Sequence, residues 1–207
     1  ATLAAKSLVL TNSGNVAAAI DEAGSGALAL VADTIRLGPL EADAASASPG
    51  TSFRMAGFSD TQLTAQREVV VSGAGSVVVD GNLDVNAGRL TGARNADQRI
   101  EASGVVRIAA VGNAGELAAV QDLGARLRIS GSRITHAGRV DLPSGQLRLH
   151  TTGAGSDDGI TLETGAVVNL AGLSKRFFDV DAFTPGGDMR LNTANGSWFY
   201  STDNGAN

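Results

Sequence analysis

The feature that most constrains the fold is an alternating pair of apolar residues that returns at a nearly constant distance along the chain. In the stretch ARLRISGSRITHAGRVDLPSGQLRL at 125–149, Leu127 and Ile129 are followed 20 residues later by Leu147 and Leu149. An arginine stands between the two apolar members of each pair, which predicts short strands with one buried and one exposed face. The stretch therefore predicts equivalent strands that recur once per repeat.

The repeat extends over almost the whole chain. When the second apolar residue of each pair is taken as a marker, successive markers are 20, 35, 20, 23, 21, 20, 21 and 21 residues apart. A fixed period of this size is typical of stacked supersecondary units. The single long step predicts an insertion around 39–61 that projects from the stack. The markers are Leu10, Leu30, Ala65, Val85, Ile108, Ile129, Leu149, Leu170 and Leu191.

Residues that favour tight corners separate the predicted strands, as in SGAG, DGN, SGS and PSG, and glycine alone accounts for 27 of the 207 residues. The apolar residues are mainly Ala, Val and Leu, with only eight aromatic side chains, which suits a narrow layered interior. We therefore expect one all-β domain over 1–207, a right-handed parallel β-helix (solenoid) of about nine coils with a period near 21 residues. A β-sandwich is the alternative, although its strands need not return at a constant step.

Two Ala-rich stretches, at 13–30 and 113–127, contain good helix formers but are interrupted by glycine. We expect coil or strand in both.

Charge and composition exclude several classes of partner. Sixteen basic and 21 acidic residues give a formal net charge of −5, with no basic cluster for phosphate, so we expect neither nucleic acid nor an anionic membrane as a partner. No stretch approaches about 18 consecutive apolar residues, so we expect no membrane insertion. The absence of cysteine suits an exported chain that crosses a secretion channel unfolded, and it is equally compatible with a cytosolic protein.

Two phrases in the last third of the chain carry a resemblance to a known family. GITLETGAVVNLAG at 159–172 and FTPGGDMRLNTANG at 183–196 resemble the coils of large bacterial exoproteins of the filamentous haemagglutinin type, which the two-partner pathway secretes. The resemblance implies an adhesin shaft that is secreted or displayed on the exterior of a Gram-negative outer membrane, with an outer-membrane secretion partner. No phrase similar to the family's amino-terminal NPNG motif occurs, which implies an internal or C-terminal segment.

Arginines and aromatic residues are the candidates for binding a carbohydrate or a host-cell surface. Arg107, Arg128, Arg148 and Arg190 each stand directly before a marker, so we expect them to form an arginine ladder. Such a ladder binds acidic polysaccharide or is simply a solvated face.

Apolar residues offer two further candidate surfaces. Phe53, Met55 and Phe58 lie in the expected insertion, where they form a recognition surface or cover a coil. Six of the eight aromatic residues lie in 177–200, and Trp198 and Tyr200 are the candidates there for stacking on sugar rings, unless they cap the stack.

Catalysis and metal binding find little support in the residue pattern. A polysaccharide-cleaving β-helix enzyme, the main alternative, needs carboxylates about 5–9 Å apart, and only Asp122 and Asp141 nearly share a register. His136 and His150 lack the spacing of zinc ligands, and the calcium-like phrase at 153–162 occurs once. We therefore expect no enzyme, cofactor or metal. A phage or fibre structural module remains a third possibility.

Overall fold

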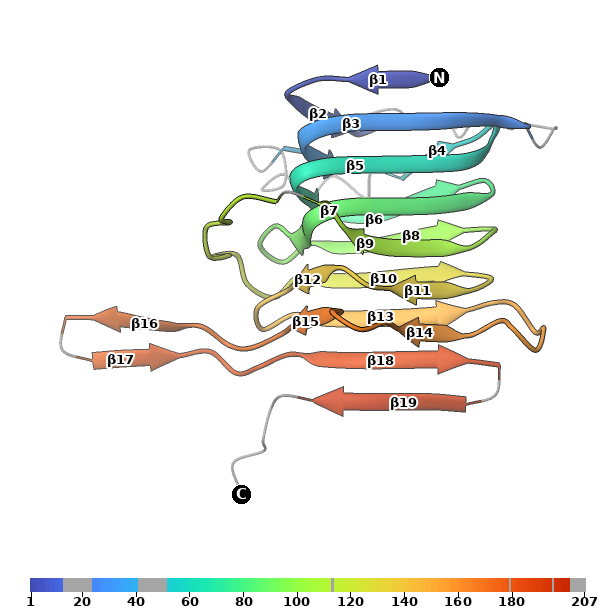
Figure 1. Cartoon of the computed structure of the whole chain (residues 1–207). Helices are drawn as coiled ribbons and strands as arrows, with labels where there is room; N and C mark the ends of the chain where they lie inside the picture. The colour runs from blue at the N-terminus through green and yellow to red at the C-terminus, as the bar shows by residue number, and fades with distance from the viewer. Residues whose placement is uncertain (13–23, 41–51, 113, 179, 195, 202–207) are drawn as a thin grey trace.

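A computed structural model describes residues 1–12, 24–40, 52–112, 114–178, 180–194 and 196–201 (Figure 1). Within these residues the chain is all-β, with two large sheets, a two-stranded ribbon and no helix that could cross a membrane. Sheet A contains β1 (Thr2–Ala4), β2 (Ser7–Leu10), β3 (Gly26–Leu37), β5 (Phe58–Val71), β7 (Asn82–Gly92), β9 (Val106–Ala110), β11 (Ile134–His136), β12 (Arg139–Asp141), β14 (Ile160–Leu162) and β15 (Val167–Asn169). Sheet B contains β4 (Phe53–Met55), β6 (Ala74–Val79), β8 (Asp97–Ala102), β10 (Arg126–Gly131), β13 (Gln146–Thr151), β18 (Asp188–Thr193) and β19 (Gly196–Ser201), and the ribbon pairs β16 (Ser174–Phe177) with β17 (Val180–Phe183).

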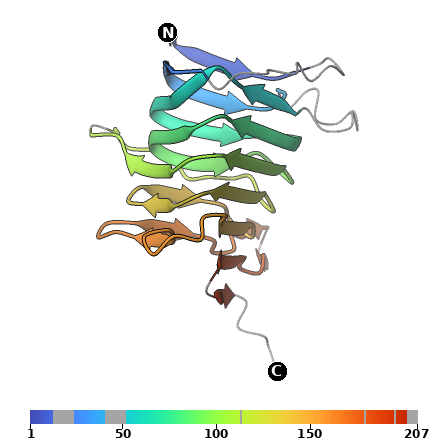
Figure 2. The same cartoon turned by 90° about the vertical axis from the view of Figure 1, so that its right-hand side faces the viewer.

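From β3 to β15 the chain moves back and forth between the two large sheets, with β11 and β12, and then β14 and β15, as consecutive strands of sheet A. The ribbon β16–β17 comes before the chain returns to sheet B at β18. When the chain returns to a sheet, the new strand pairs parallel with a strand from an earlier layer. Figure 2 shows the resulting layers stacked from the N-terminus to the C-terminus. The exception in the two sheets is β19, which returns antiparallel to β18. The prediction of an all-β chain with parallel strands is therefore confirmed for the described residues, and the parallel pairing disagrees with an antiparallel sandwich.

Alternation along each strand sends one set of side chains into a shared core. In sheet A, Leu30, Leu63, Val85 and Ile108 are successive Cα partners, and all four are buried. In sheet B the equivalent column is formed by Val77, Ile100, Ile129, Leu149 and Leu191. These residues are mainly Val, Leu and Ile, which fill a narrow space between the sheets.

The sequence markers do not form one column. Leu30, Val85 and Ile108 share a column of sheet A, whereas Ile129, Leu149 and Leu191 lie in sheet B. Ala65 pairs with Ala32 and Ala87, so it is two residues away from the column of Leu30. The reason is that both sheets use the same alternating pattern, and the step length does not tell which sheet a strand joins.

The expected insertion at 39–61 is only partly described, since 41–51 lie outside the described residues. Phe53 and Met55 belong to β4, which pairs with β6, and Phe58 begins β5. Met55 is buried and Phe53 packs against the core. The interpretation of these residues as part of a projecting insertion is therefore wrong, because they are strand residues of the two sheets.

Neither Ala-rich stretch contains a helix in its described part. Residues 26–30 begin β3, and 114–125 form neither helix nor strand. The expectation of coil or strand is confirmed there, and 13–23 lie outside the described residues.

One corner of the stack is built from small residues at equivalent positions. The amide of Gly104 donates to the carbonyl of Gly81 (2.8 Å), that of Ser132 to Gly104 (2.8 Å), and that of Gly153 to Ser132 (3.3 Å). Gly81 has a φ of +79°, and a Cβ there would overlap the carbonyl oxygen of Ser59 in the neighbouring layer. The layers thus approach at this corner too closely for a side chain at Gly81.

A side-chain ladder beside this corner gives a testable pKa. Asn82 Nδ2 donates to Asp60 Oδ1 (2.9 Å), and Ser59 Oγ donates to Asp60 Oδ2 (2.7 Å). These two bonds favour the carboxylate and therefore hold the pKa of Asp60 below its usual value, and the bond from Asn82 has the larger effect.

Replacing Asn82 with alanine is expected to raise the pKa of Asp60 toward that of an ordinary aspartate, as followed by NMR titration of its carboxyl carbon. Asn86→Ala, on the same strand, is the control and should leave this pKa unchanged; an equal effect of both variants would contradict the role of the Asn82 bond.

Candidate functional site

Four arginines form a straight column across sheet B. Arg99 of β8, Arg128 of β10, Arg148 of β13 and Arg190 of β18 are successive Cα partners. Their strand neighbours, such as Leu127 and Ile129, are buried, so alternation places the arginines on the outer face. Adjacent strands lie about 4.8 Å apart, which sets the step of this arginine column.

The expected ladder is confirmed for three arginines and wrong for the fourth. Arg107 lies in β9 of sheet A, where its Cα partners are Asp84 and Thr135. Its place in the column is taken by Arg99, which does not stand before any of the nine markers. The available signal was the pair Arg99-Ile100, the same arginine-aliphatic dipeptide that occurs at Arg107, but the dipeptide alone does not say which sheet it joins.

Carboxylates surround the first part of the arginine column. Asp97 forms ion pairs with Arg128 (3.2 Å) and Arg126 (3.8 Å), and Arg99 approaches Glu101 (3.5 Å). All of these side chains are at least one-third exposed, and exposed ion pairs contribute only about 0–1 kcal/mol each. These arginines are therefore only loosely held by their neighbours.

Arg148 lies between Arg128 and Arg190 in the arginine column. The outward residues beside it on β13 are Gln146 and His150, and within the described residues its guanidinium has no hydrogen-bond or ion-pair partner. The outward positions of β8, β10, β13 and β18 carry five arginines and three carboxylates. This face is thus locally positive, although the formal net charge of the chain is −5. The five arginines are Arg99, Arg126, Arg128, Arg148 and Arg190, and the carboxylates are Asp97, Glu101 and Asp188.

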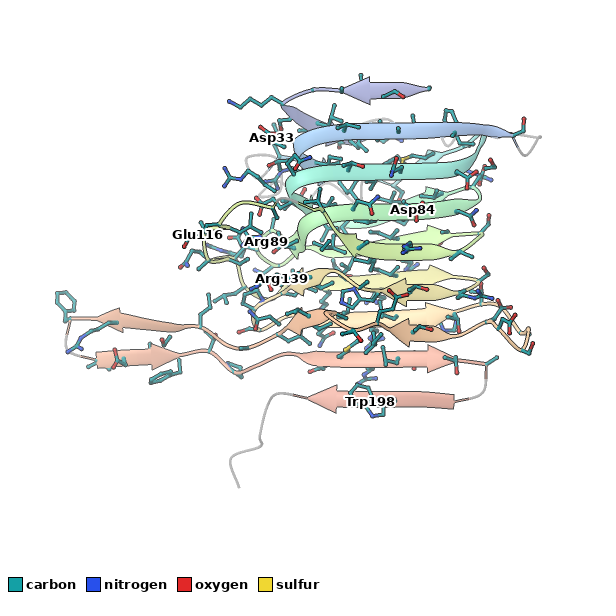
Figure 3. All side chains as sticks on the ribbon, viewed as in Figure 1. Asp33, Asp84, Arg89, Glu116, Arg139 and Trp198 are labelled. Carbon is teal, nitrogen blue, oxygen red and sulfur yellow. The ribbon has the colours of Figure 1, made fainter. Side chains whose placement is uncertain are left out.

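The aromatic candidates do not join the arginine column. Trp198 of β19 is the Cα partner of Leu191, on the opposite side of the strand pair from Arg190, and it is 51% exposed (Figure 3). Tyr200 is the partner of Met189, and its side chain lies outside the described residues. The structure also separates Phe53 and Phe58, on β4 and β5, from both groups.

The acidic pair considered for catalysis is not brought into register. Asp141 lies in β12, whereas Asp122 lies in the segment between β9 and β10, outside any strand. Asp141 is only 2% exposed, and both of its oxygens accept from Arg139 Nε (2.9 and 2.8 Å). The near-alignment of Asp122 and Asp141 expected from the markers is therefore wrong, because the segment containing Asp122 leaves the stack.

The two histidines have opposite environments. His136 is buried in sheet A between Ile108 and Leu162, with Nε2 3.3 Å from the carbonyl of Val167 and no partner for Nδ1 among the described residues. Burial lowers the pKa of His136, and the Val167 carbonyl opposes this only in part. His150 is exposed on β13. Among the described residues, no group of three or more His, Asp or Glu side chains is arranged to hold a metal ion.

No family model matches the chain, and no match was found among curated proteins or solved structures. The resemblance to filamentous haemagglutinin-type exoproteins thus depends on the phrases at 159–172 and 183–196. These phrases correspond to β14, β15 and β18, three strands of the parallel sheets.

Proposed function

We propose that the chain is a right-handed parallel β-helix segment of a secreted bacterial surface exoprotein, that it acts in adhesion without catalysis, and that its arginine column binds acidic polysaccharide. The alternation of the chain between two parallel sheets supports the β-helix, and right-handed crossovers are the rule for parallel strands. Seven strands follow one another along sheet A, from β1 to β14. We count the coils of the proposed helix from these strands and not from the nine sequence markers.

The observation that carries the binding proposal is the alignment of four arginines along the direction of stacking. Like charges at directly paired positions destabilise a sheet, so the column has an electrostatic cost when nothing is bound. A linear polyanion lying along the column would offset this repulsion at several steps at once. An isolated anion would meet only one or two guanidinium groups, so the column favours a chain of repeated negative charges.

The adhesive role and the location follow from the resemblance together with this surface. The phrases at 159–172 and 183–196 correspond to stacked strands, as they would in the coils of the exoproteins they resemble. The parent protein would then be secreted or held at the bacterial cell surface, and would need an outer-membrane secretion partner. The segment would serve as a rigid shaft with one binding face.

Changing Arg128 and Arg148 to glutamine together is expected to weaken binding of a carboxylated polysaccharide, such as polygalacturonate, about tenfold. Two exposed ion pairs contribute on the order of 1–2 kcal/mol in total, which sets this magnitude. The measurement is titration calorimetry at low and high salt. Binding to the wild type should weaken with salt, and the variant should show a smaller salt dependence because fewer charges take part.

Arg107→Gln is the control for position, since it makes the same substitution once, at an arginine of sheet A that lies outside the column. It should leave the affinity nearly unchanged. The double variant should be as stable as the wild type or slightly more stable, because repulsion within the column is reduced. Equal losses of affinity in the control and in the double variant would contradict the role of the column. Release of shorter sugar chains during the titration would favour the polysaccharide-cleaving enzyme instead.

A further inference from the structure

The second halves of β3, β5 and β7 form one wall of sheet A, and the layer that contains β9 contributes no strand to this wall within the described residues. The second halves of β3, β5 and β7 pair in register through Ile35, Val69 and Leu90, and the next strand in this wall is β12, in which Val140 pairs directly with Leu90. The chain between β9 and β10, residues 111–125, supplies no strand here within its described part. Figure 1 shows this segment as a loop that projects beside β7 and β12.

The segment is held over the outer side of the wall by one side chain. Arg89 of β7 donates from Nη1 to the carbonyl of Ala118 (2.6 Å) and from Nε and Nη2 to Glu68 Oε2 (2.9 and 2.6 Å). Arg89 and Glu68 are largely buried, which fixes the position of the anchor. The loop is therefore attached in its middle as well as at its two ends.

A cavity of about 460 Å³ lies between this segment and the wall. Its polar lining comes from Arg89, Glu116, Arg139, Asp141 and Asn169. Figure 3 shows Arg89, Glu116 and Arg139 on the same side of the molecule. The volume lies in the range of small-molecule sites, which is about 300–1,000 Å³.

Several polar groups of this cavity have unused hydrogen-bonding capacity. A carboxylate has about four acceptor positions, yet among the described residues the carboxylate of the buried Asp141 accepts only from Arg139 Nε. Both terminal nitrogens of Arg139 and the Nδ2 of Asn169 make no hydrogen bond within the described part of the chain, and Glu116 has no partner there. The cavity therefore offers donors and acceptors side by side.

We propose that this cavity binds one neutral sugar residue. Two arginines and two carboxylates line it, and Arg89 is already paired with Glu68, so the cavity has no excess of positive charge for an anionic ligand. Ring hydroxyls both donate and accept, so they match Arg139 and Asn169 on one hand and Asp141 and Glu116 on the other. Leu117 and Leu173, also in the lining, offer apolar contact to the C–H face of a ring. The site lies on sheet A, away from the arginine column of sheet B, and does not depend on the polyanion proposal.

The test is a titration of the whole chain with the methyl glycosides of glucose, galactose and mannose, followed by NMR of the methyl groups of Leu117 and Leu173. We expect at least one glycoside to bind in the millimolar range and to shift both sets of signals. Glu116→Gln should weaken this binding at least threefold, whereas Asp122→Asn, which removes a carboxylate from the same segment outside the cavity, should have no effect. Arg139→Lys, which retains the charge but loses the planar pair of terminal donors, should also weaken binding.

Three results would overturn the proposal. They are the absence of binding by all three glycosides, binding that Glu116→Gln leaves unchanged, and binding of glycine or acetate in place of a sugar. Loss of polygalacturonate binding in the Arg128 and Arg148 variant has no bearing on this site, so the two proposals fail separately. Unchanged NMR spectra of the variants away from the cavity would show that the fold is intact.

Discussion

Replacing Gly81 with alanine is expected to lower the free energy of unfolding by about 2–5 kcal/mol. The φ of +79° costs an alanine about 1–2 kcal/mol, since its Cβ meets the following carbonyl in the left-handed region. The Cβ would also overlap the backbone oxygen of Ser59, and forcing the two layers apart adds about 1–3 kcal/mol. Urea denaturation followed by circular dichroism measures the loss.

Gly57→Ala separates these two contributions. Gly57 has a similar φ of +84°, but no heavy atom lies within 4 Å of its Cβ position. This variant should therefore lose only the conformational part, about 1–2 kcal/mol. Equal losses at Gly57 and Gly81 would mean that the close approach of layers at the corner is not important for stability.

Replacing His136 with leucine is expected to remove most of a pH-dependent loss of stability. Burial depresses the pKa of His136 in the folded chain, whereas the unfolded chain binds a proton near pH 6.5. Below that pH the unfolded state gains a proton that the folded state does not, so stability falls with decreasing pH by up to about 1.4 kcal/mol per unit. The loss ends once the pH has passed below the depressed pKa of the folded state. At pH 5 the difference between wild type and variant should have changed by up to about 2 kcal/mol relative to pH 7.

The measurement is the free energy of unfolding from urea titrations at several values between pH 5 and pH 7.5. His150→Leu is the control, because His150 is exposed on β13 and its replacement should leave the pH dependence in place. A leucine at position 136 also removes the buried Nδ1 that lacks a partner, which favours the variant at every pH. Identical pH profiles of the wild type and His136→Leu would contradict the assignment.

The sequence predicted the register best where one circuit of the chain is short and regular. Leu127 and Ile129 pair with Leu147 and Leu149, as the 20-residue step required. The same step misassigned Ala65, because the partner of Val85 is Leu63, so the chain takes 22 residues and not 20 between these two positions. The markers follow one short strand of each period, whereas β3, β5 and β7 are continuous strands of 12, 14 and 11 residues.

The arginine column was predicted in part for a similar reason. Arg128, Arg148 and Arg190 precede aliphatic residues in strands of one sheet, and Arg107 precedes an aliphatic residue in the other. Local alternation fixes which residues point outward, but the sheet that a strand joins depends on its neighbours in space. That choice is not encoded in any dipeptide.

The cavity was beyond sequence-based prediction altogether. It depends on the pairing of β12 with β7, in which Thr91 Oγ1 donates to the carbonyl of Asp141, 50 residues away (2.7 Å). Nothing in the Ala-rich stretch at 113–127 indicates that a strand is missing from the wall. That no strand lies between β7 and β12 is recognised only when both of these strands are placed in the sheet.

The direct pairing of β7 with β12 makes the wall continuous without residues 111–125. The strand register therefore places no requirement on the length of this segment. Loops supported in this way on a rigid framework are the part of a protein that can vary in specificity while the framework stays constant. Exchange of residues 114–120 for another peptide is therefore expected to leave the pairing of β7 with β12 unchanged.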